Sequence, residues 1–583
     1  MILQALKEYY DRKTADLESG IAPRGWFKGR IDFVIVLTLD GTFKQLDCEQ
    51  TIKNNKTVSH SCLLPYIGKQ ALKHTMSGND ANLLWDNATF VLGVGKNGDK
   101  KLASFIATIK ERLGDINDQA VNSVLKFLED GQRDPTIFAP VVRHSDYGEE
   151  IRKGRVYITF RLVNDEQLFI FQRLPIKVRV SEALEPSEKR GTCLVTGELD
   201  QSIELCHLVI KNLYGARKDP NVVSFNKEAF NSFGKDQSAN APVGKRAAFA
   251  YTTALNHLTA RESNQKLQVG DATAVFWSER NTNLEKQVRD FFSEPPKDDP
   301  DRGVKAVASL FKAVETGAFA RDEDMIRFFV LGMTPFGPRI AVRFWIVDTV
   351  SGMAGKICQH FEDTRIVHGP RDKDTLSVFR LLVSTAAHGE SKNIPPNLGG
   401  DMMRAILEGL PYPQTFLQAA IRRIRAEHDV SYPRAALIKA CINRSTRFRN
   451  PEIKEELKMS LDKSNQNIGY RLGRLFATLE RIQIRKFTQK GGKEPNSTIR
   501  DRYYGSASGT PITVFGTLIR LSKHHLASLE NVGERINFEK LLGEIMCGIN
   551  DFPAHLRLDD QGRFAIGYYH QMSDFFTKKN DNE

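Results

Sequence analysis

Apolar and polar residues alternate along the chain in a way that predicts short helices and strands first and helices alone at the end. Residues 1–13 carry apolar side chains with helical spacing, at Ile2, Leu3, Leu6, Tyr9 and Tyr10. Two β-rich runs, 31–39 and 42–46, flank Asp40-Gly41, a dipeptide typical of hairpin turns. Helices are predicted near 101–113 and 117–128, followed by a second hairpin over 155–180 that turns at Asn164-Asp165.

The middle of the chain, residues 181–400, mixes both kinds of element. Strands are predicted at 274–277 and 340–347, and helices at 247–259 and 304–316. Because no regular βαβ repeat is present, this part is expected to be α+β. Proline and glycine near 394–400 mark a predicted boundary, and a further one is expected near 181.

From Met402 onward the pattern is almost wholly helical. A helix after Ser464 has an apolar stripe at Ile468, Leu472, Leu475, Phe476, Leu479 and Ile482. A flexible insert over 489–493 ends it, and Thr510 is predicted to cap the next helix, with Pro511 at its first position. Two more helices are expected through 541–549 and 564–576. The predicted fold is an α+β N-terminal region of mixed β-hairpins and helices (1–400), a basic helical connector (401–458) and an all-α C-terminal bundle (459–583).

Length and composition narrow the class of protein. The 583 residues, 41% of them hydrophobic, suffice for two to four domains. No apolar run reaches the roughly 18 residues of a membrane span, and the first residues do not resemble a signal peptide. The seven cysteines are scattered and form no CxxC pair, which indicates free thiols in a reducing compartment. A cytoplasmic protein with no membrane partner is expected.

Positive charge is concentrated in residues 411–500. This stretch holds 19 Lys or Arg against 8 Asp or Glu, a local charge of 19 − 8 = +11, whereas the whole chain carries +12. Such an imbalance favours an external anion, and a nucleic-acid phosphate backbone is the usual one. A solvated basic face and an acidic protein partner remain alternatives. Four arginines form a row about a quarter turn from the apolar stripe of the 468–482 helix: Arg471, Arg474, Arg481 and Arg485.

Known catalytic patterns are missing. Gly93-Val94-Gly95-Lys96-Asn97 lacks both the first glycine and the Ser or Thr of a phosphate loop. Cys193, Cys206 and His207 fit no metal-ligand spacing. We therefore predict no catalytic residue, no metal site and no cofactor. Metal ligands assembled from distant positions stay open, so a metal-dependent nuclease with dispersed ligands is the alternative function.

A polar loop at residues 224–242 combines amides, hydroxyls, a lysine and glycine. Such side chains can contact minor-groove edges, although the same residues are also common turn formers. Parts of this loop (Ser224-Phe225-Asn226, Gly234-Lys235-Asp236-Gln237 and Asn240-Ala241-Pro242) resemble a hallmark segment of the large subunit of the type I-C CRISPR surveillance complex, Cascade. Further segments match in order along nearly the whole chain: 84–87, 193–198, 247–256, 341–345 and 501–508.

This resemblance implies a non-catalytic DNA-sensing subunit, not an enzyme. The N-terminal part would recognise a protospacer-adjacent motif in duplex DNA and help to open the strands, while a guide RNA reads the sequence. The implied partners are crRNA, target double-stranded DNA and its displaced strand, the Cascade backbone and crRNA-handle subunits, the small subunit and a helicase-nuclease effector. A general RNA-binding scaffold is a third possibility, which predicts no preference for a flanking motif.

Residue roles follow from the resemblance and from side-chain chemistry. Motif reading and strand wedging are predicted for Asn226, Lys235, Gln237 and Asn240, with Lys69, Lys73 and Asn79 as a second group. The row Arg471, Arg474, Arg481 and Arg485 is predicted to bind phosphates; if about six are neutralised, log affinity falls with log salt at a slope of about −5. Purine-rich codons for Lys454-Glu455-Glu456 would suit internal initiation at Met459, which would release 583 − 459 + 1 = 125 residues as a free small subunit.

Overall fold

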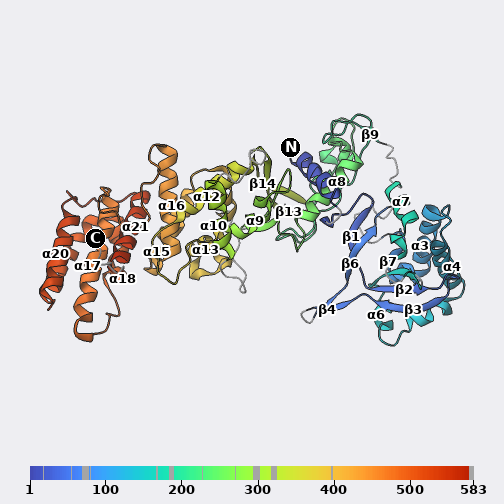
Figure 1. Cartoon of the computed structure of the whole chain (residues 1–583), viewed down its shortest axis with the longest axis horizontal. Helices are drawn as coiled ribbons and strands as arrows, with labels where there is room; N and C mark the ends of the chain where they lie inside the picture. Colours follow the sequence, from blue (N-terminus) through green and yellow to red (C-terminus); the bar gives the residue numbers. More distant parts are fainter. Residues whose placement is uncertain are drawn as a thin grey trace. The chain divides into compact units, whose positions relative to one another are not determined.

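The computed structural model describes residues 1–16, 19–53, 56–67, 78, 80–163, 165, 168–182, 189–225, 227–269, 271–292, 302–316, 325–395 and 398–576. They form two compact units, one of Met1–Ile210 with Asn221–His257 and one of Lys211–Pro220 with Leu258–Glu583 (Figure 1). This division differs from the predicted ranges 1–400, 401–458 and 459–583, which follow composition and not packing. Lys69, Lys73, Asn79 and Asn226 lie outside the described residues.

The first unit contains a four-stranded sheet in the order β3-β2-β8-β7. Its strands are β2 (Phe33–Leu37), β3 (Phe43–Cys48), β7 (Trp85–Asn87) and β8 (Tyr157–Leu162). The predicted first hairpin is confirmed, because β2 and β3 pair antiparallel around the Asp40-Gly41 turn. The five residues of β2 are all buried, as expected for a strand inside a sheet.

Helices α3 (Gly98–Leu113) and α4 (Gln119–Arg133) share a hydrophobic core with this sheet. The Phe160 ring on β8 contacts Phe105 of α3 and Phe127 of α4. Asp118 begins α4 by accepting hydrogen bonds from the amides of Ala120 and Val121, at 2.8 and 3.4 Å. Both predicted helices are confirmed.

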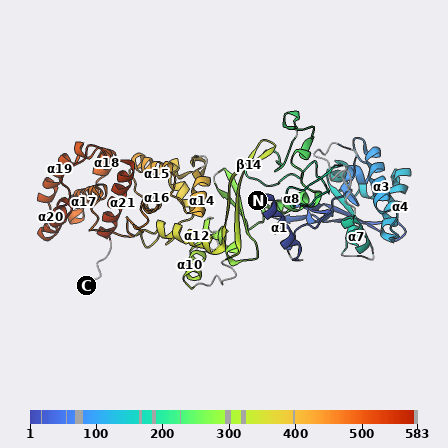
Figure 2. The same ribbon diagram turned by 90° about the horizontal axis from the view of Figure 1, so that it is seen from above.

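The rest of the first unit consists of short elements and a helix pair. The short elements are β1 (Trp26–Ile31), β4 (Thr51–Lys53), β5 (Lys56–Val58), β6 (His60–Pro65), α2 (Ala88–Val91), α5 (Ala139–Val142), α6 (Gly148–Arg152), β9 (Arg190–Gly191) and β10 (Gln201–Ser202). Helices α1 (Ile2–Thr14) and α8 (Lys245–Leu258) lie side by side in Figures 1 and 2. The Tyr9 hydroxyl lies 3.0 Å from Nδ1 of His257, and the Tyr10 ring meets Phe249 edge-on. Both helices were predicted.

The second predicted hairpin, over residues 155–180, is wrong. Its first limb is β8, but β8 runs parallel to β2 and antiparallel to β7. A single bridge between Arg161 and Phe169 is all that pairs the two limbs within the described residues. The second limb is helix α7 (Leu174–Glu182), in which Ile176 and Val180 are buried one turn apart. The alternation of apolar and polar residues suggested a strand, and burial at i and i+4 favoured the helix.

The second unit begins with an antiparallel sheet in the order β11-β12-β13-β14. Its strands are β11 (Lys266–Val269), β12 (Ala272–Ser278), β13 (Arg327–Phe336) and β14 (Arg339–Thr349). Helices α9 (Asn283–Phe292), α10 (Arg302–Glu315), α12 (Val350–Thr364), α13 (Val378–Ser384) and α14 (Leu398–Glu408) accompany it. The predictions of strands at 274–277 and 340–347 and of a helix at 304–316 are confirmed, whereas β13 was not foreseen.

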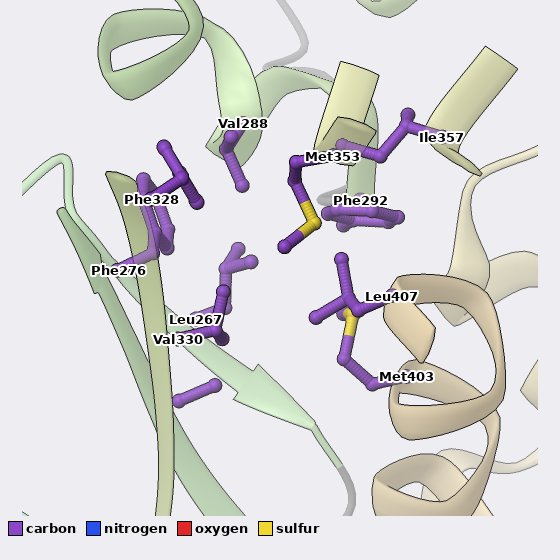
Figure 3. A pocket seen from close by; sticks show the side chains of 11 residues that line it. Leu267, Phe276, Val288, Phe292, Phe328, Val330, Met353, Ile357, Met403 and Leu407 are labelled. Carbon is purple, nitrogen blue, oxygen red and sulfur yellow. The ribbon is translucent and has the colours of Figure 1, made fainter. Parts of the chain in front are cut away.

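Apolar side chains fill the space between this sheet and its helices. Figure 3 shows Phe276, Phe328 and Val330 of the sheet facing Met353 of α12 and Met403 of α14. The cavity between them has a volume of only about 10 Å³, roughly the space of one water molecule, and its lining is apolar. This gap is therefore a packing void and not a ligand site.

The remaining elements of the second unit are helices, as predicted. They are α15 (Gln414–Glu427), α16 (Tyr432–Arg449), α17 (Ile468–Thr488), α18 (Ile499–Gly509), α19 (Phe515–Ala527), α20 (Val532–Met546) and α21 (Leu558–Phe576). Helix α17 packs along α21, and α21 also contacts α15 and α16, so one hydrophobic core continues across Met459. Thr510 stands at the predicted N-cap position with Pro511 directly after it, but it begins a 3-10 turn, Pro511–Thr513, without a side-chain cap hydrogen bond, and α19 follows that turn. None of the described helices is long and apolar enough to cross a membrane.

A buried carboxylate links three of these helices. Asp363 of α12 is 3% exposed and accepts hydrogen bonds from Arg444 at 3.1 Å and from Arg447 at 2.7 Å. The Arg444 guanidinium also donates to the carbonyls of Ala405 and Leu410, each at 2.9 Å, at the end of α14. One carboxylate thus holds α12, α14 and α16 together through charged hydrogen bonds.

Replacing Asp363 with alanine should leave two guanidinium groups without their counter-charge. The expected loss in free energy of unfolding is about 3–5 kcal/mol, as for other buried ion pairs that lose one partner. Urea unfolding followed by circular dichroism measures it. Asp372→Ala, at an exposed position, is the matched control and should cost less than about 0.5 kcal/mol. Equal losses in the two variants would contradict the assignment.

Candidate nucleic-acid interface

The polar loop of the first unit ends in a tight projecting turn. The amide of Lys235 donates to the carbonyl of Ser232 at 3.0 Å, and the two central residues, Phe233 and Gly234, have φ angles of +51° and +66°. Two positive φ angles are typical of a type I′ turn, which suits glycine but strains phenylalanine. Phe233 is 97% exposed, so packing within the first unit does not offset this backbone strain.

The side-chain amide of Asn240 braces this turn through hydrogen bonds. Its Oδ1 accepts a hydrogen bond from the amide of Ser232, and its Nδ2 donates to the carbonyls of Lys235 and Gln237, all at 2.9 Å. Because the amide group is engaged within the loop, Asn240 positions the turn. The structure thus shows a positioning role for Asn240, whereas its contact with base edges stays a prediction.

Phe233 and Lys235 of the turn and Gln237 just after it are among the exposed side chains of this segment. Lys235 forms no ion pair with any described residue. The Gln237 side-chain oxygen lies 3.8 Å from the Cys206 sulfur, a weak contact that leaves its amide nitrogen available. Phe233 was not singled out from the sequence, although it stands in the polar loop between the turn formers Ser232 and Gly234.

The arginine row of α17 does not face outward as a set. Arg474 is 1% exposed and binds Gln571 at 3.1 Å and Glu544 at 2.9 Å. Arg471 is 7% exposed and donates to the carbonyl of Asn465 at 3.0 Å and to Gln466. Both side chains are buried within the bundle, so the structure argues against their predicted phosphate contacts.

The other two arginines of the row are half-buried. Arg485 forms a two-bond ion pair with Glu534, at 2.5 and 3.0 Å. Arg481 lies over the Phe576 ring, 4.7 Å from its centre, and burial followed by the charge of Arg485 lowers its pKa. Of these two half-buried arginines, Arg481 is the one that forms no ion pair with a carboxylate of the described residues.

Carboxylates from other parts of the chain compensate much of the basic stretch 411–500. Arg444 and Arg447 pair with Asp363, and Arg449 pairs with Asp559. These carboxylates lie outside the stretch in sequence but beside it in space. The concentration of charge in sequence therefore overstates the charge available at the surface.

Exposed cations without such partners lie on other helices of the bundle. Among the described residues, no carboxylate lies within salt-bridge distance of Arg502 on α18 or of Arg520 and Lys523 on α19. Arg520 and Lys523 are three positions apart and so share one helix face. Nothing in their sequence context distinguished these residues from ordinary surface cations.

In the described ranges, no group of three or more His, Cys, Asp or Glu side chains is placed to bind a metal ion. His207 is buried, hydrogen-bonded to the Tyr251 hydroxyl, and burial lowers its pKa to about 4. His207 is thus a neutral packed side chain that holds helix α8.

Removing the Asn240 amide should loosen the turn without unfolding the protein. Asn240→Ala deletes three hydrogen bonds worth about 0.5–1.5 kcal/mol each. Hydrogen exchange of the Ser232 and Lys235 amides should therefore accelerate at least about tenfold, with little change in melting temperature. Asn231→Ala, on the same loop but without side-chain bonds, is the control. Unchanged exchange in Asn240→Ala would refute the bracing role.

Comparison with known proteins identifies the family of this chain. No curated protein matches the chain. A family model described as CRISPR-associated protein (Cas_Csd1) matches residues 6–576, nearly the full length. The chain therefore belongs to the Cas_Csd1 family of CRISPR-associated proteins.

Proposed function

We propose that this CRISPR-associated protein is the non-catalytic large subunit of a type I-C Cascade complex. It recognises the protospacer-adjacent motif in double-stranded DNA, assists strand opening, and recruits a separate helicase-nuclease. The observation that carries the proposal is the braced turn at 232–235, which presents an exposed aromatic ring beside a lysine and an amide.

The exposed side chains of Phe233, Gln237 and Lys235 each suit one part of this task. A phenylalanine on a rigid tip can insert between base pairs and stack on the exposed face of the last one, as apolar wedges do in the minor groove. The Gln237 amide can donate to and accept from base edges, where A·T and G·C pairs differ by one donor. The Lys235 ammonium can pair with a phosphate, which adds affinity without sequence preference.

The bundle supplies the second contact. Arg481, Arg502, Arg520 and Lys523 present positive charge on the second unit, which suits the displaced single strand. We further propose internal initiation at Met459, since helices α17–α21 all follow this residue and pack on one another. The free small subunit would then carry the same surface cations.

Replacing Phe233 with alanine should slow opening of an intact duplex by the crRNA-loaded complex. Loss of one stacking contact of about 1–3 kcal/mol predicts a rate lower by roughly tenfold or more. The 2-aminopurine fluorescence of a base next to the motif reports opening. A duplex with a pre-melted bubble beside the motif should restore the rate, because the wedge is then not needed.

The control for this experiment is Phe336→Ala, which removes another exposed phenylalanine, at the end of β13.

Gln237→Ala should weaken discrimination between motif and non-motif duplexes, and Lys235→Ala should weaken binding to both duplexes equally. A Phe233→Ala complex that opens intact DNA at the normal rate would reject the wedge. Cleavage of DNA by the isolated chain, abolished by EDTA, would reject the non-catalytic role.

Neutralising Arg520 and Lys523 together should weaken single-stranded DNA binding and flatten its salt dependence. Each lost phosphate contact reduces the slope of log affinity against log salt by about 0.7, so the double glutamine variant should lose about 1.4. Fluorescence anisotropy between 50 and 300 mM salt measures the slope. Arg404→Gln is the control for loss of an exposed arginine, because Glu408 already pairs with that guanidinium, at 2.9 Å. An unchanged slope in the double variant would exclude this helix face.

A further inference from the structure

The first unit contains a polar cleft that the proposed function does not use. It has a volume of about 360 Å³ and lies between helix α1, the start of helix α8 and the turn at 193–201. Arg24 and Arg246 supply charge to its lining, and Tyr10 and Phe249 supply aromatic rings. Its volume falls in the lower range of small-ligand sites and exceeds the apolar void of the second unit many times over.

The two arginines of the cleft lack a counter-charge. Neither forms an ion pair with any described residue. Both guanidinium groups line the same cleft, and burial followed by the charge of Arg246 lowers the pKa of Arg24. Because a guanidinium keeps its proton at neutral pH, both side chains bring a positive charge to the cleft.

The acidic residues of the cleft do not fill this role. Asp11 is held by Lys7 of the same helix at 2.6 Å. Glu198 is exposed and lies 3.2 Å from the Thr196 hydroxyl. Neither carboxylate forms an ion pair with Arg24 or Arg246, so both guanidinium groups can accept an external anion as partner.

The rest of the lining favours a particular anion. The Phe249 ring is half-buried at the cleft and meets Tyr10 edge-on, with 5.9 Å between ring centres. Thr196, Glu198 and Gln201 add hydroxyl, carboxylate and amide groups that can bind sugar hydroxyls or base edges. Planar guanidinium groups bind phosphate oxygens through two parallel bonds, and aromatic faces accept bases.

We propose that this cleft binds one nucleotide unit, with its phosphate between Arg24 and Arg246 and its ring against Phe249. The nucleotide can belong to a nucleic-acid strand or be free in solution, because the same groups recognise both. The site is separate from the turn at 232–235 and does not rest on the proposed DNA-opening role.

Binding of labelled probes to the full-length chain tests this site. The probes are a ten-nucleotide RNA, a DNA of the same sequence, and fluorescent AMP. The double variant Arg24→Gln, Arg246→Gln should weaken binding of at least one probe tenfold or more, and the single variant Arg246→Gln several-fold. Arg246 is exposed on α8, so the single variant remains informative if the half-buried Arg24 affects folding. Lys100→Gln on α3, an exposed cation outside the cleft lining, is the charge-matched control.

The pattern of losses identifies the source of the nucleotide. A loss confined to the oligonucleotides supports a nucleotide within a strand, and the RNA and DNA probes then show which one. A loss that includes AMP supports a free nucleotide. Affinities of both variants within twofold of the Lys100→Gln control for all three probes would overturn the proposal, whatever the duplex-opening experiments show.

Discussion

The second unit depends on one buried carboxylate that serves two arginines. Asp363 and Arg444 are both removed from water, and neither charge would be tolerable there alone. Arg444 uses its remaining donors on the carbonyls of Ala405 and Leu410 at the end of α14. It also lies over the Tyr412 ring, at 4.7 Å. The Arg444 guanidinium thus pairs with a carboxylate, bonds the end of α14 and packs on an aromatic ring. These contacts hold α16 against α12.

The same interaction explains why charge counted along the sequence misleads. Residues 411–500 carry a net charge of +11, and an external polyanion was the natural expectation. The structure places Asp363, Glu534, Glu544 and Asp559 against this stretch, although each lies outside it in sequence. A sequence window measures charge along the chain, whereas pairing depends on distances between elements 49 to 110 residues apart. The positively charged surface without carboxylate partners is therefore smaller than the sequence suggests, and part of it lies on α18 and α19.

Local patterns predicted the elements well where packing and periodicity agree. The hairpin around Asp40-Gly41 and the helix at 468–488 follow directly from turn chemistry and from an apolar stripe. The segment after β8 failed because its residues alternate like a strand, yet its buried positions lie on one helix face. The candidate site shows the same limit. The polar character of the loop was evident, but whether Asn240 faced a ligand or its own backbone could be decided only by three-dimensional contacts.

The energetics of Phe233 set it apart from the rest of the first unit. A left-handed backbone costs a phenylalanine about 1–2 kcal/mol, and glycine or asparagine would avoid most of it. Full exposure means that the ring gains nothing from burial in return. Three hydrogen bonds from Asn240 nevertheless hold the turn in this conformation. A rigid tip loses little conformational entropy on binding. The strain of the turn is already present in the free chain, so burial of the ring against a flat apolar partner contributes directly to affinity. The end of a base-pair stack is such a partner, and stability of the isolated chain would favour a smaller residue at this position.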